Sequence, residues 1–225
     1  MDTLIDDILK RAIEKKTLDR EDAFRLMEVK LNSREMYALM ATANMATREL
    51  FNNFGEVHAQ IGINYAPCPN KCKFCVFSVA DKKVELSLKE VLRRAKLFVK
   101  EGANAIFLMT TGDYDFEKFV KIGQAVRKVI PPKMPLVANT GDFGISEAKK
   151  LLDAGFTAIY HVVRLREGID TKIDPTDRLK TIEAAKSVGL DLSYCIEPIG
   201  PEHTIEEIVD AIFLGKSLNQ QLWQL

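Results

Sequence analysis

Apolar positions along the chain follow two alternating periods from about residue 57 onward. Short β-prone runs, such as AIFLMTT at 105–111, alternate with amphipathic stretches in which apolar residues recur at helical spacing. Strands that alternate with helices of roughly 10 to 15 residues are typical of βαβ units and a parallel sheet. The pattern therefore predicts an α/β fold in which each strand is followed by a helix.

This part of the chain predicts five strands and five helices. We expect strands over 57–65, 105–111, 135–140, 158–163 and 190–200. We expect helices over 87–102, 116–129, 146–155, 177–189 and 204–218. Gly102 and the pair Pro131-Pro132 end the first two helices, because glycine suits the turn after a helix and proline cannot continue one. Together these elements predict a partial (β/α) TIM-type barrel with about five βα units.

The first 54 residues predict helices only. We expect them over 2–15, 19–30 and 33–52, with Asp19 as the N-cap of the second. Their charges are mixed, which favours packing on the barrel over a role at a membrane surface. We therefore expect a helical extension over 1–54 and a partial barrel over 55–225.

Composition and charge narrow the class of protein. The 225 residues are 47% hydrophobic, which is enough apolar material for a core. Thirty-two basic residues balance 32 acidic ones, which argues against a dedicated nucleic-acid-binding surface. The first 20 residues lack the apolar core of a signal peptide, and no apolar run approaches the roughly 20 residues of a membrane helix. We expect a cytoplasmic protein that does not bind nucleic acid or membranes.

The strongest chemical signal is a group of three cysteines directly after the first predicted barrel strand. Cys68, Cys72 and Cys75 have the spacing C-x3-C-x2-C, whereas Cys195 stands alone far downstream. Barrel enzymes place their chemistry on the loops that follow the strands. Three thiolates on one loop can bind three irons of a 4Fe–4S cluster and leave the fourth iron open, as a catalytic site requires. The alternative is zinc with Cys195 or a histidine as fourth ligand, although zinc loops more often contain paired C-x2-C units.

This cysteine motif, with Phe74 before the last cysteine, resembles that of the radical S-adenosylmethionine (radical SAM) superfamily. Within the superfamily the chain is most similar to the biotin synthase group, which includes the iron-hydrogenase maturase and methylornithine synthase. The resemblance covers about residues 55–219 and rests also on the segments 75–80, 110–113, 166–167, 177–179 and 198–202. It implies an enzyme with a 4Fe–4S cluster and S-adenosylmethionine (SAM) as cofactors.

The resemblance implies a reaction and its partners. The enzyme would cleave SAM reductively to methionine and a 5′-deoxyadenosyl radical, which abstracts hydrogen from a small-molecule substrate in cofactor or metabolite biosynthesis. An electron donor such as ferredoxin or flavodoxin would supply the electron. Two alternatives remain, namely sulfur insertion of the lipoate or biotin type with a partner protein, and a non-catalytic zinc-binding scaffold. Biotin synthase activity itself is disfavoured, because that enzyme holds a second, sulfur-donating cluster with cysteines from several strands. The strands predicted over 105–111 and 135–140 contain no cysteine, and Cys195 alone cannot hold such a cluster. A role as a small, buried apolar residue is favoured for Cys195.

The resemblance also assigns roles to residues that follow successive strands. The segment 110–113 would meet the SAM amino group, and Glu167 would accept hydrogen bonds from the ribose hydroxyls. Arg178 would hold the SAM carboxylate, and Gly200 would allow the backbone to approach the adenine. The implied cofactor-binding residues are Phe74, Ser78, Thr110, Thr111, Gly112, Asp113, Asn139, Arg166, Glu167, Arg178 and Gly200, beside the metal ligands Cys68, Cys72 and Cys75.

Plain structural roles compete with several of these assignments. The segment 110–113 could be a turn with a helix cap, and the arginines of RLREG (164–168) could be a solvated strand end. His161 could face the inside of the barrel or be a hydrogen-bonded core histidine. Asn139 and Glu197 are further polar residues expected inside the barrel.

The chain is short for this architecture. A complete eightfold barrel takes about 250 residues, and this chain ends after the fifth predicted barrel helix. The last strand would then leave an unpaired edge, which is an association hazard. We expect either a shortened chain or a second chain, identical or different, that covers this edge.

Overall fold

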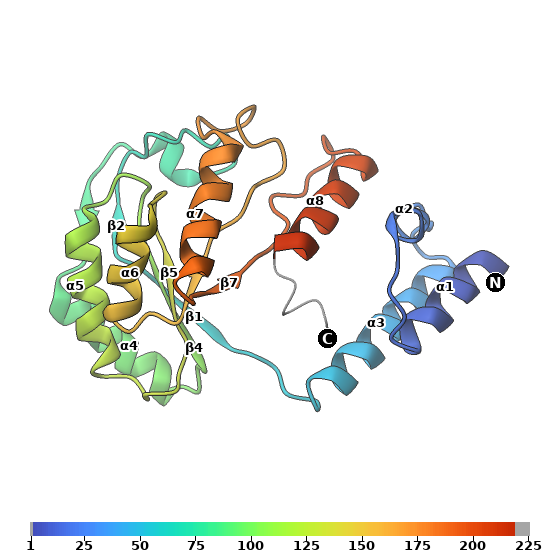
Figure 1. Ribbon diagram of the computed structural model, residues 1–225, viewed down its shortest axis with the longest axis horizontal. Helices are drawn as coiled ribbons and strands as arrows, with labels where there is room; N and C mark the ends of the chain where they lie inside the picture. Colours follow the sequence, from blue (N-terminus) through green and yellow to red (C-terminus); the bar gives the residue numbers. More distant parts are fainter. Residues whose placement is uncertain (1, 219–225) are drawn as a thin grey trace. The chain divides into compact units, whose positions relative to one another are not determined.

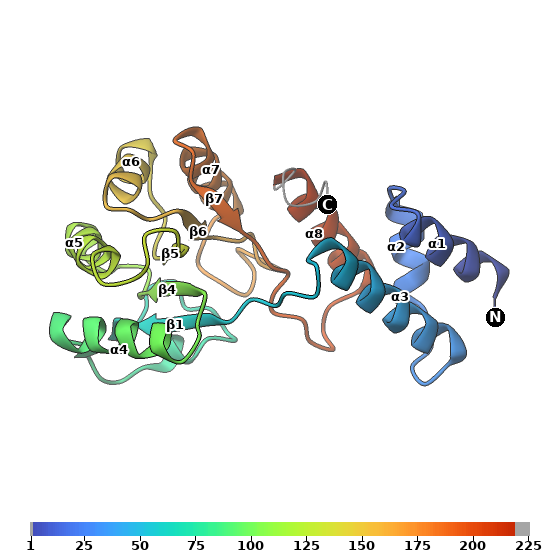
Figure 2. The same cartoon turned by 90° about the horizontal axis from the view of Figure 1, so that it is seen from below.

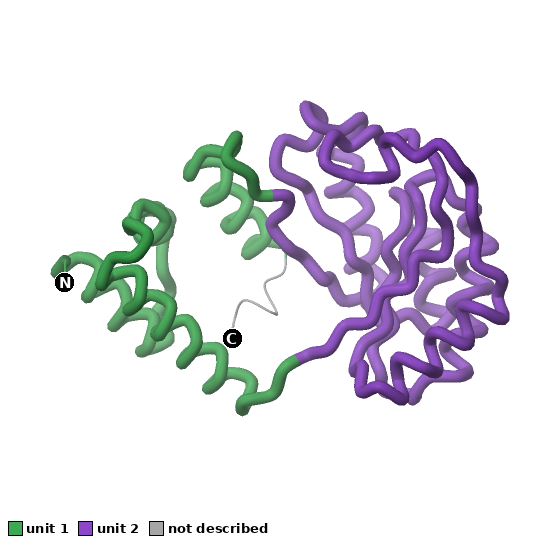
Figure 3. The backbone as a smooth tube through the Cα atoms, turned by 180° about the vertical axis from the view of Figure 1, so that it is seen from behind, with its two compact units in different colours: residues 1–55, 199–225 green, residues 56–198 purple. Residues whose placement is uncertain are grey.

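The structure is a computed structural model and describes residues 2–218 (Figure 1). It divides into two compact units, which Figure 3 shows in different colours. Unit 1 comprises the described residues of Met1–Gly55 and Ile199–Leu225, and Glu56–Pro198 form unit 2. No helix among the described residues is long and apolar enough to cross a membrane.

Unit 2 is built on a five-stranded parallel sheet with the strand order β1-β4-β5-β6-β7. Its strands are β1 (His58–Gly62), β4 (Ala105–Met109), β5 (Leu136–Asn139), β6 (Ala158–Tyr160) and β7 (Asp191–Ser193). Neighbours in the sheet follow one another along the chain, as repeated βα units require. The predicted partial barrel is therefore confirmed, and within the described residues the sheet stays open, with β1 and β7 at its edges.

Four helices form an arc outside the strands (Figure 2). They are α4 (Leu88–Lys100), α5 (Phe116–Arg127), α6 (Ile145–Asp153) and α7 (Pro175–Ser187). Ser87 and Asp115 cap α4 and α5 by accepting hydrogen bonds from backbone N–H groups of the first turn. Helix α7 begins two residues earlier than predicted, because Asp174 caps it and Pro175 suits its first position.

The two faces of the sheet carry different side chains because residues alternate along each strand. One face bears the fully buried apolar residues that pack beneath the helices, among them Ile61, Ile106, Leu108, Leu136 and Ile159. The opposite, inner face carries a second apolar cluster made of Ala105, Phe107, Val137 and Ala158, with Met109 and Tyr160 against it. The strands thus provide an apolar inner face, and polar groups follow where the strands end.

Three predicted strands are wrong in extent. The run 57–65 is divided between β1 and a short strand β2 (Asn64–Tyr65), which pairs antiparallel with β3 (Val84–Glu85). This small sheet closes the base of the loop that carries the cysteines. The runs 158–163 and 190–200 contribute only the three residues each of β6 and β7, because beyond them the chain keeps only isolated backbone hydrogen bonds, such as that from Leu165 N–H to the Glu197 carbonyl (3.1 Å).

Unit 1 is helical. It contains α1 (Thr3–Ile13), α2 (Arg20–Met27), α3 (Arg34–Leu50) and α8 (Ile205–Leu218). Asp19 caps α2 as predicted and forms a reciprocal capping box with Asp22, whose carboxylate also accepts hydrogen bonds from Arg11. Helix α8, expected as the last helix of the barrel, contacts α2 and groups with the N-terminal helices. The division of the chain at residue 54 into an extension and a barrel stays a prediction.

Candidate functional site

The topology brings five loops to one edge of the sheet. All five strands are parallel, so their carboxyl ends lie together. The loops that follow them are 66–83 with the cysteines, 110–115, 140–144, 161–174 and 194–198. Most residues singled out by the sequence lie on these loops.

The cysteine loop is ordered by hydrogen bonds between its own backbone groups. Cys68 N–H donates to the Phe77 carbonyl (3.1 Å), and Cys75 N–H donates to the Cys72 carbonyl (3.0 Å). Ser78 donates to the Cys75 carbonyl through both its N–H (3.0 Å) and its hydroxyl (2.7 Å). All three cysteines of the loop are free thiols. The predicted Ser78 thus holds the turn that carries the last cysteine.

Two neighbouring loops hold the cysteine loop in place. Lys73 N–H donates to the Asp170 carbonyl (2.9 Å), and Lys172 N–H donates to the Asn70 carbonyl (2.8 Å). The Asn70 side chain also packs on Gly112, so closely that a Cβ atom at Gly112 would lie 2.5 Å from Asn70 Nδ2. The cysteine loop therefore lies between the loops after β4 and β6, which carry most of the predicted cofactor-binding residues.

The donor set of this loop fits an iron–sulfur cluster. Burial raises the pKa of the Cys72 thiol, the positive charge of Arg164 opposes this shift, and negative charge on Cys75 and Cys68 adds to it, so the three thiols interact electrostatically. Soft thiolates on one loop are the ligands that iron–sulfur clusters take. Among the described residues, no three or more His, Cys, Asp and Glu side chains are grouped closely enough to hold a single metal ion. A cubane cluster needs a different arrangement, because each thiolate binds a separate iron.

The predicted threonines after β4 are held by hydrogen bonds. The buried Thr111 donates its N–H to Asn64 Oδ1 (3.0 Å) and accepts at Oγ1 from Asn64 Nδ2 (2.8 Å). The Thr110 hydroxyl donates to Thr140 Oγ1 (2.9 Å) on the loop after β5. The sequence did not predict a role for Asn64, because nothing in its neighbouring residues distinguishes it from other polar residues in strands.

Gly141 is a point of close approach between the loops after β4 and β5. A Cβ atom at this position would lie 2.1 Å from the Gly112 carbonyl oxygen, and a backbone atom cannot move aside as the tip of a flexible side chain can. We expect Gly141→Ala to lower the free energy of unfolding by about 1–3 kcal/mol, in the range of overpacking substitutions. Urea denaturation followed by circular dichroism measures this change.

Gly62 is the matched control for this substitution. It lies in β1, and nothing lies within 4 Å of the position its Cβ would take. Gly62→Ala should leave the stability unchanged or raise it by up to about 1 kcal/mol, because alanine loses less backbone entropy on folding. Equal stability of the two variants would contradict the proposed crowding at Gly141.

Asp142 is the centre of a largely buried polar network that the sequence reading missed. Its Oδ1 accepts from His161 Nε2 (2.8 Å), Arg178 Nη1 (3.1 Å) and Thr181 Oγ1 (3.3 Å). Burial works to raise the pKa of Asp142, but the His161 hydrogen bond and the charge of Arg178 outweigh it, and the pKa lies below its usual value. Asp142 lies on the loop that follows β5, just as 110–113 follow β4. A polar residue shortly after a predicted strand was therefore a sequence signal for Asp142 as well. His161 is the hydrogen-bonded core histidine of the two alternatives.

Glu167 and Arg178, both predicted from the sequence, belong to the same network. Glu167 accepts from the Thr171 hydroxyl (2.6 Å) and from Arg164 N–H (3.0 Å), and Arg178 Nε lies 3.7 Å from its Oε2. Arg178 Nε is buried and has no hydrogen-bond acceptor among the described residues. A buried guanidinium donor without an acceptor fits an anionic ligand group such as a carboxylate.

The other predicted residues differ in exposure, backbone conformation and hydrogen bonding. Phe74 and Asp113 are exposed, and the half-buried Asn139 accepts from Thr110 N–H through its carbonyl (3.0 Å). Arg166 has a left-handed backbone conformation (φ 55°). Gly200 belongs to the other compact unit, where its N–H donates to His203 Nδ1 (3.0 Å). The roles assigned to all these residues stay predictions.

Cys195 is not enclosed in apolar surroundings as expected. It is half-buried, and its Sγ lies 2.7 Å from the Tyr160 hydroxyl oxygen. Burial raises the pKa of the Cys195 thiol to about 11, so the group is protonated at neutral pH. Burial also raises the pKa of Tyr160. Both groups are therefore neutral hydrogen-bonding partners.

The network around Asp142 predicts that the protein loses stability in acid. Burial lowers the pKa of His161 below its ordinary value of 6.5. Just below pH 6.5 the histidine is therefore protonated in the unfolded chain but remains neutral in the folded protein. The lowered pKa of Asp142 acts in the same direction at lower pH. The free energy of unfolding should therefore fall between pH 6.5 and pH 5, by at most about 1.4 kcal/mol per pH unit for each proton.

Urea denaturation at several pH values measures this dependence. His161→Gln should flatten the curve between pH 6.5 and 5. An unchanged slope in His161→Gln would show that other groups cause the acid sensitivity.

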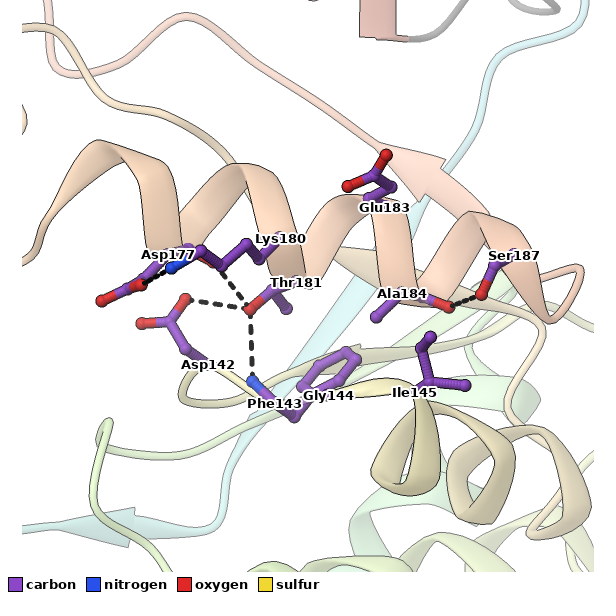
Figure 4. Close-up of a pocket in the computed structure, with 10 residues that line it drawn as sticks. All are labelled: Asp142, Phe143, Gly144, Ile145, Asp177, Lys180, Thr181, Glu183, Ala184 and Ser187. Atoms are coloured by element: carbon purple, nitrogen blue, oxygen red, sulfur yellow. Dashed lines mark hydrogen bonds and ion pairs between the residues drawn. The ribbon is translucent and has the colours of Figure 1, made fainter.

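A groove lies beside the same network on the helical side of the sheet (Figure 4). It runs between the start of α6 and one side of α7, and Asp142 and Thr181 line it together with Phe143, Gly144, Ile145, Asp177, Lys180, Glu183, Ala184 and Ser187. None of these lining residues belongs to the set predicted from the sequence. Asp142 therefore connects the buried network with solvent on the outer side.

These features define a partial (β/α) barrel whose first strand leads into a loop of three free thiols. The model of the Radical SAM superfamily matches residues 66–215, which is more than half of the chain. The chain therefore belongs to the radical SAM superfamily. Members of this superfamily use a 4Fe–4S cluster and SAM.

Curated relatives and solved structures agree with this membership. The chain is 26% identical over 234 residues to a biotin synthase of Clostridioides difficile, covering 97% of this chain and 71% of the relative. It is 29% identical over 214 residues to a biotin synthase of Fusobacterium nucleatum, covering 88% of this chain and 59% of that protein. The chain thus spans well under the full length of these relatives.

Two solved structures share the fold. Methylornithine synthase (PylB) has a TM-score of 0.83 at 17% identity, covering 94% of this chain and 64% of that protein. HydG, a maturase of the [FeFe]-hydrogenase, has a TM-score of 0.78 at 15% identity, covering 96% of this chain and 52% of that protein. At such identities these similarities show the fold alone.

Proposed function

We propose that this chain binds a 4Fe–4S cluster through Cys68, Cys72 and Cys75 and cleaves SAM reductively, so that hydrogen is abstracted from a small molecule in cofactor or metabolite biosynthesis. The observation that carries the proposal is the position of the three free thiols. They lie at the same edge of the sheet as the buried pair Glu167 and Arg178. The cysteine loop is hydrogen bonded to the loop that carries Glu167, and Arg178 lies near the start of α7.

Each group at this edge has a physical task under the proposal. When bound, the reduced cluster supplies the electron that splits SAM into methionine and a 5′-deoxyadenosyl radical. The three thiolates would hold the cluster, and SAM would bind at its iron that has no protein ligand. Arg178 offers a buried N–H to the SAM carboxylate, and Glu167 accepts hydrogen bonds beside it. The hydroxyls of Thr110 and Thr111 follow the end of strand β4 and would accept from the SAM amino group.

The inner face of the sheet supplies the surface for the substrate. Its apolar floor of Phe107, Val137 and Ala158 excludes water from a reactive radical. Tyr160 and Cys195 add a neutral polar pair at the end of this floor. These groups suit a small molecule with an apolar part.

Sulfur insertion of the lipoate or biotin type is the narrower alternative. It would need sulfur from a second cluster or a partner protein, because within the described strands and the loops at their carboxyl ends the only thiol outside the cysteine loop is Cys195.

Anaerobic reconstitution tests the proposal. Purified protein supplied with iron and sulfide should bind about four irons and absorb near 400 nm, as cubane clusters do. With dithionite and SAM it should release methionine and 5′-deoxyadenosine in equal amounts, measured by chromatography. A colourless protein that retains zinc and never cleaves SAM would support the scaffold alternative instead. Incubation with deuterated candidate substrates, read as deuterium in 5′-deoxyadenosine, then identifies the hydrogen donor.

A further inference from the structure

The surface around the cysteine loop is unusually apolar for an exposed region. Val76 and Val79 are 61% and 79% exposed, and Phe74 between the cysteines is 42% exposed. Ile169, 71% exposed, lies next to Asp170, whose carbonyl accepts from the cysteine loop. We call these four residues the apolar rim. Exposed apolar residues that gather around one feature mark interaction sites more often than scattered ones do.

The same loop concentrates positive charge. Residues 66–84 contain four lysines, Lys71, Lys73, Lys82 and Lys83, and one acidic residue, Asp81, so the segment carries three net positive charges. All four lysines are exposed. The loop after β6 (161–174) has no net charge, because Arg164, Arg166 and Lys172 balance three acidic residues, Glu167, Asp170 and Asp174. Asp170 pairs with Lys73 of the cysteine loop. The whole chain has no net charge, so this basic region is balanced by acidic residues elsewhere.

The combination points to a protein partner with an acidic face. An apolar centre flanked by lysines matches a surface on which carboxylates surround a small apolar patch. Opposite charges accelerate the encounter of two proteins and orient them, and the effect weakens as salt screens it. Because three of the four rim residues lie on the cysteine loop itself, a partner seated on the rim would bring its own redox centre close to the cluster.

We propose that the apolar rim and its lysines are the docking surface for a small acidic one-electron donor protein. This inference rests on the proposed function, since only a cluster that must be reduced needs such a donor. The step is a single electron transfer, in which the donor's reduced centre loses one electron and the oxidised 4Fe–4S cluster gains it. No bond is formed or broken between the two proteins.

Two reductants separate docking from catalysis. Dithionite is a small molecule that needs no docking surface, whereas reduced flavodoxin must bind to deliver its electron. Lys82→Glu/Lys83→Glu should lower flavodoxin-driven SAM cleavage about tenfold or more at low salt, and leave dithionite-driven cleavage within about twofold of wild type. Val76→Ser/Val79→Ser should likewise lower flavodoxin-driven cleavage and leave dithionite-driven cleavage close to that of wild type. The control Lys128→Glu/Lys133→Glu makes the same charge change at exposed lysines beyond the C-terminal end of α5, and should behave as wild type with both reductants.

A binding measurement tests the surface even in protein that never cleaves SAM. Calorimetric titration of the reconstituted protein with flavodoxin should show a Kd that rises with salt and is about tenfold weaker for Lys82→Glu/Lys83→Glu. Equal affinities of wild type and this variant, or an equal loss in the control, would overturn the proposal. Failure of wild type to cleave SAM with dithionite would instead overturn the proposed function, and circular dichroism confirms that the variants are folded.

Discussion

Replacing Cys75 with alanine should abolish both cluster binding and SAM cleavage. The proposed cluster has three protein ligands, all on one loop, and loss of one leaves an iron without its thiolate. We expect activity to fall by more than about 100-fold, since even outer partners of metal ligands typically account for 10–100-fold. Cys68→Ala and Cys72→Ala should behave in the same way. Iron content, absorbance near 400 nm and 5′-deoxyadenosine release measure the effect after anaerobic reconstitution.

Cys195→Ala is the matched control, because it removes a thiol of the same unit that lies outside the loop. This variant should retain about four irons and dithionite-driven SAM cleavage. Iron binding by Cys75→Ala at the wild-type level would place the metal elsewhere. Loss of metal in Cys195→Ala would favour a site in which Cys195 is the fourth ligand, as the zinc alternative requires.

Replacing Arg178 with methionine should cause the largest loss of stability. The Arg178 and Glu167 side chains are 6% and 1% exposed, and Arg178 also donates to Asp142. Methionine keeps the apolar stem but leaves Asp142 without its arginine partner. It also leaves Glu167 with Arg164 as its remaining arginine partner, at 3.8 Å. Removing one partner of a buried ion pair typically costs about 3–5 kcal/mol. We expect a decrease of that size in the free energy of unfolding, measured by urea denaturation, together with weaker SAM binding.

Lys180→Met is the control on the same helix. Lys180 pairs with Asp177, but both side chains are exposed, at 71% and 54%. Such surface pairs contribute at most about 1 kcal/mol. Combining Arg178→Met with Asp142→Asn should restore part of the lost stability, because the second change removes one unpaired charge. If Arg178→Met and Lys180→Met cost the same, the network around Asp142 contributes no more than a surface pair.

The fold was largely predictable because its signals are local. Apolar residues recur at every second position in strands and every third or fourth position in helices, so a short window of sequence shows the pattern. Helix caps such as Asp19 also act within one turn. The cysteine spacing is also local, since Cys68, Cys72 and Cys75 lie within eight residues. The extents of the strands were less predictable, because an apolar run continues past the point where its neighbour in the sheet ends. The run 57–65 therefore divides between two sheets.

The site was predictable only in part. The sequence pointed to Glu167 and Arg178 singly, but not to Asp142, which joins Arg178 to His161. It also missed Asn64, whose amide holds Thr111 across 47 residues of chain. Polar residues in loops have no periodicity, and a single amide or carboxylate shows no sign in the sequence of the partner it will meet.

By itself, then, the sequence determined the α/β class, the order of strands and helices, the three-thiol loop and the radical SAM resemblance. Only the tertiary structure decided which polar groups are buried together, that Cys195 meets Tyr160, and that the lysines and two valines of the cysteine loop are exposed. The physical reason is the range of the interactions. Periodicity and capping act over a few residues, whereas the contacts between loops depend on five strands ending side by side at one edge of the sheet.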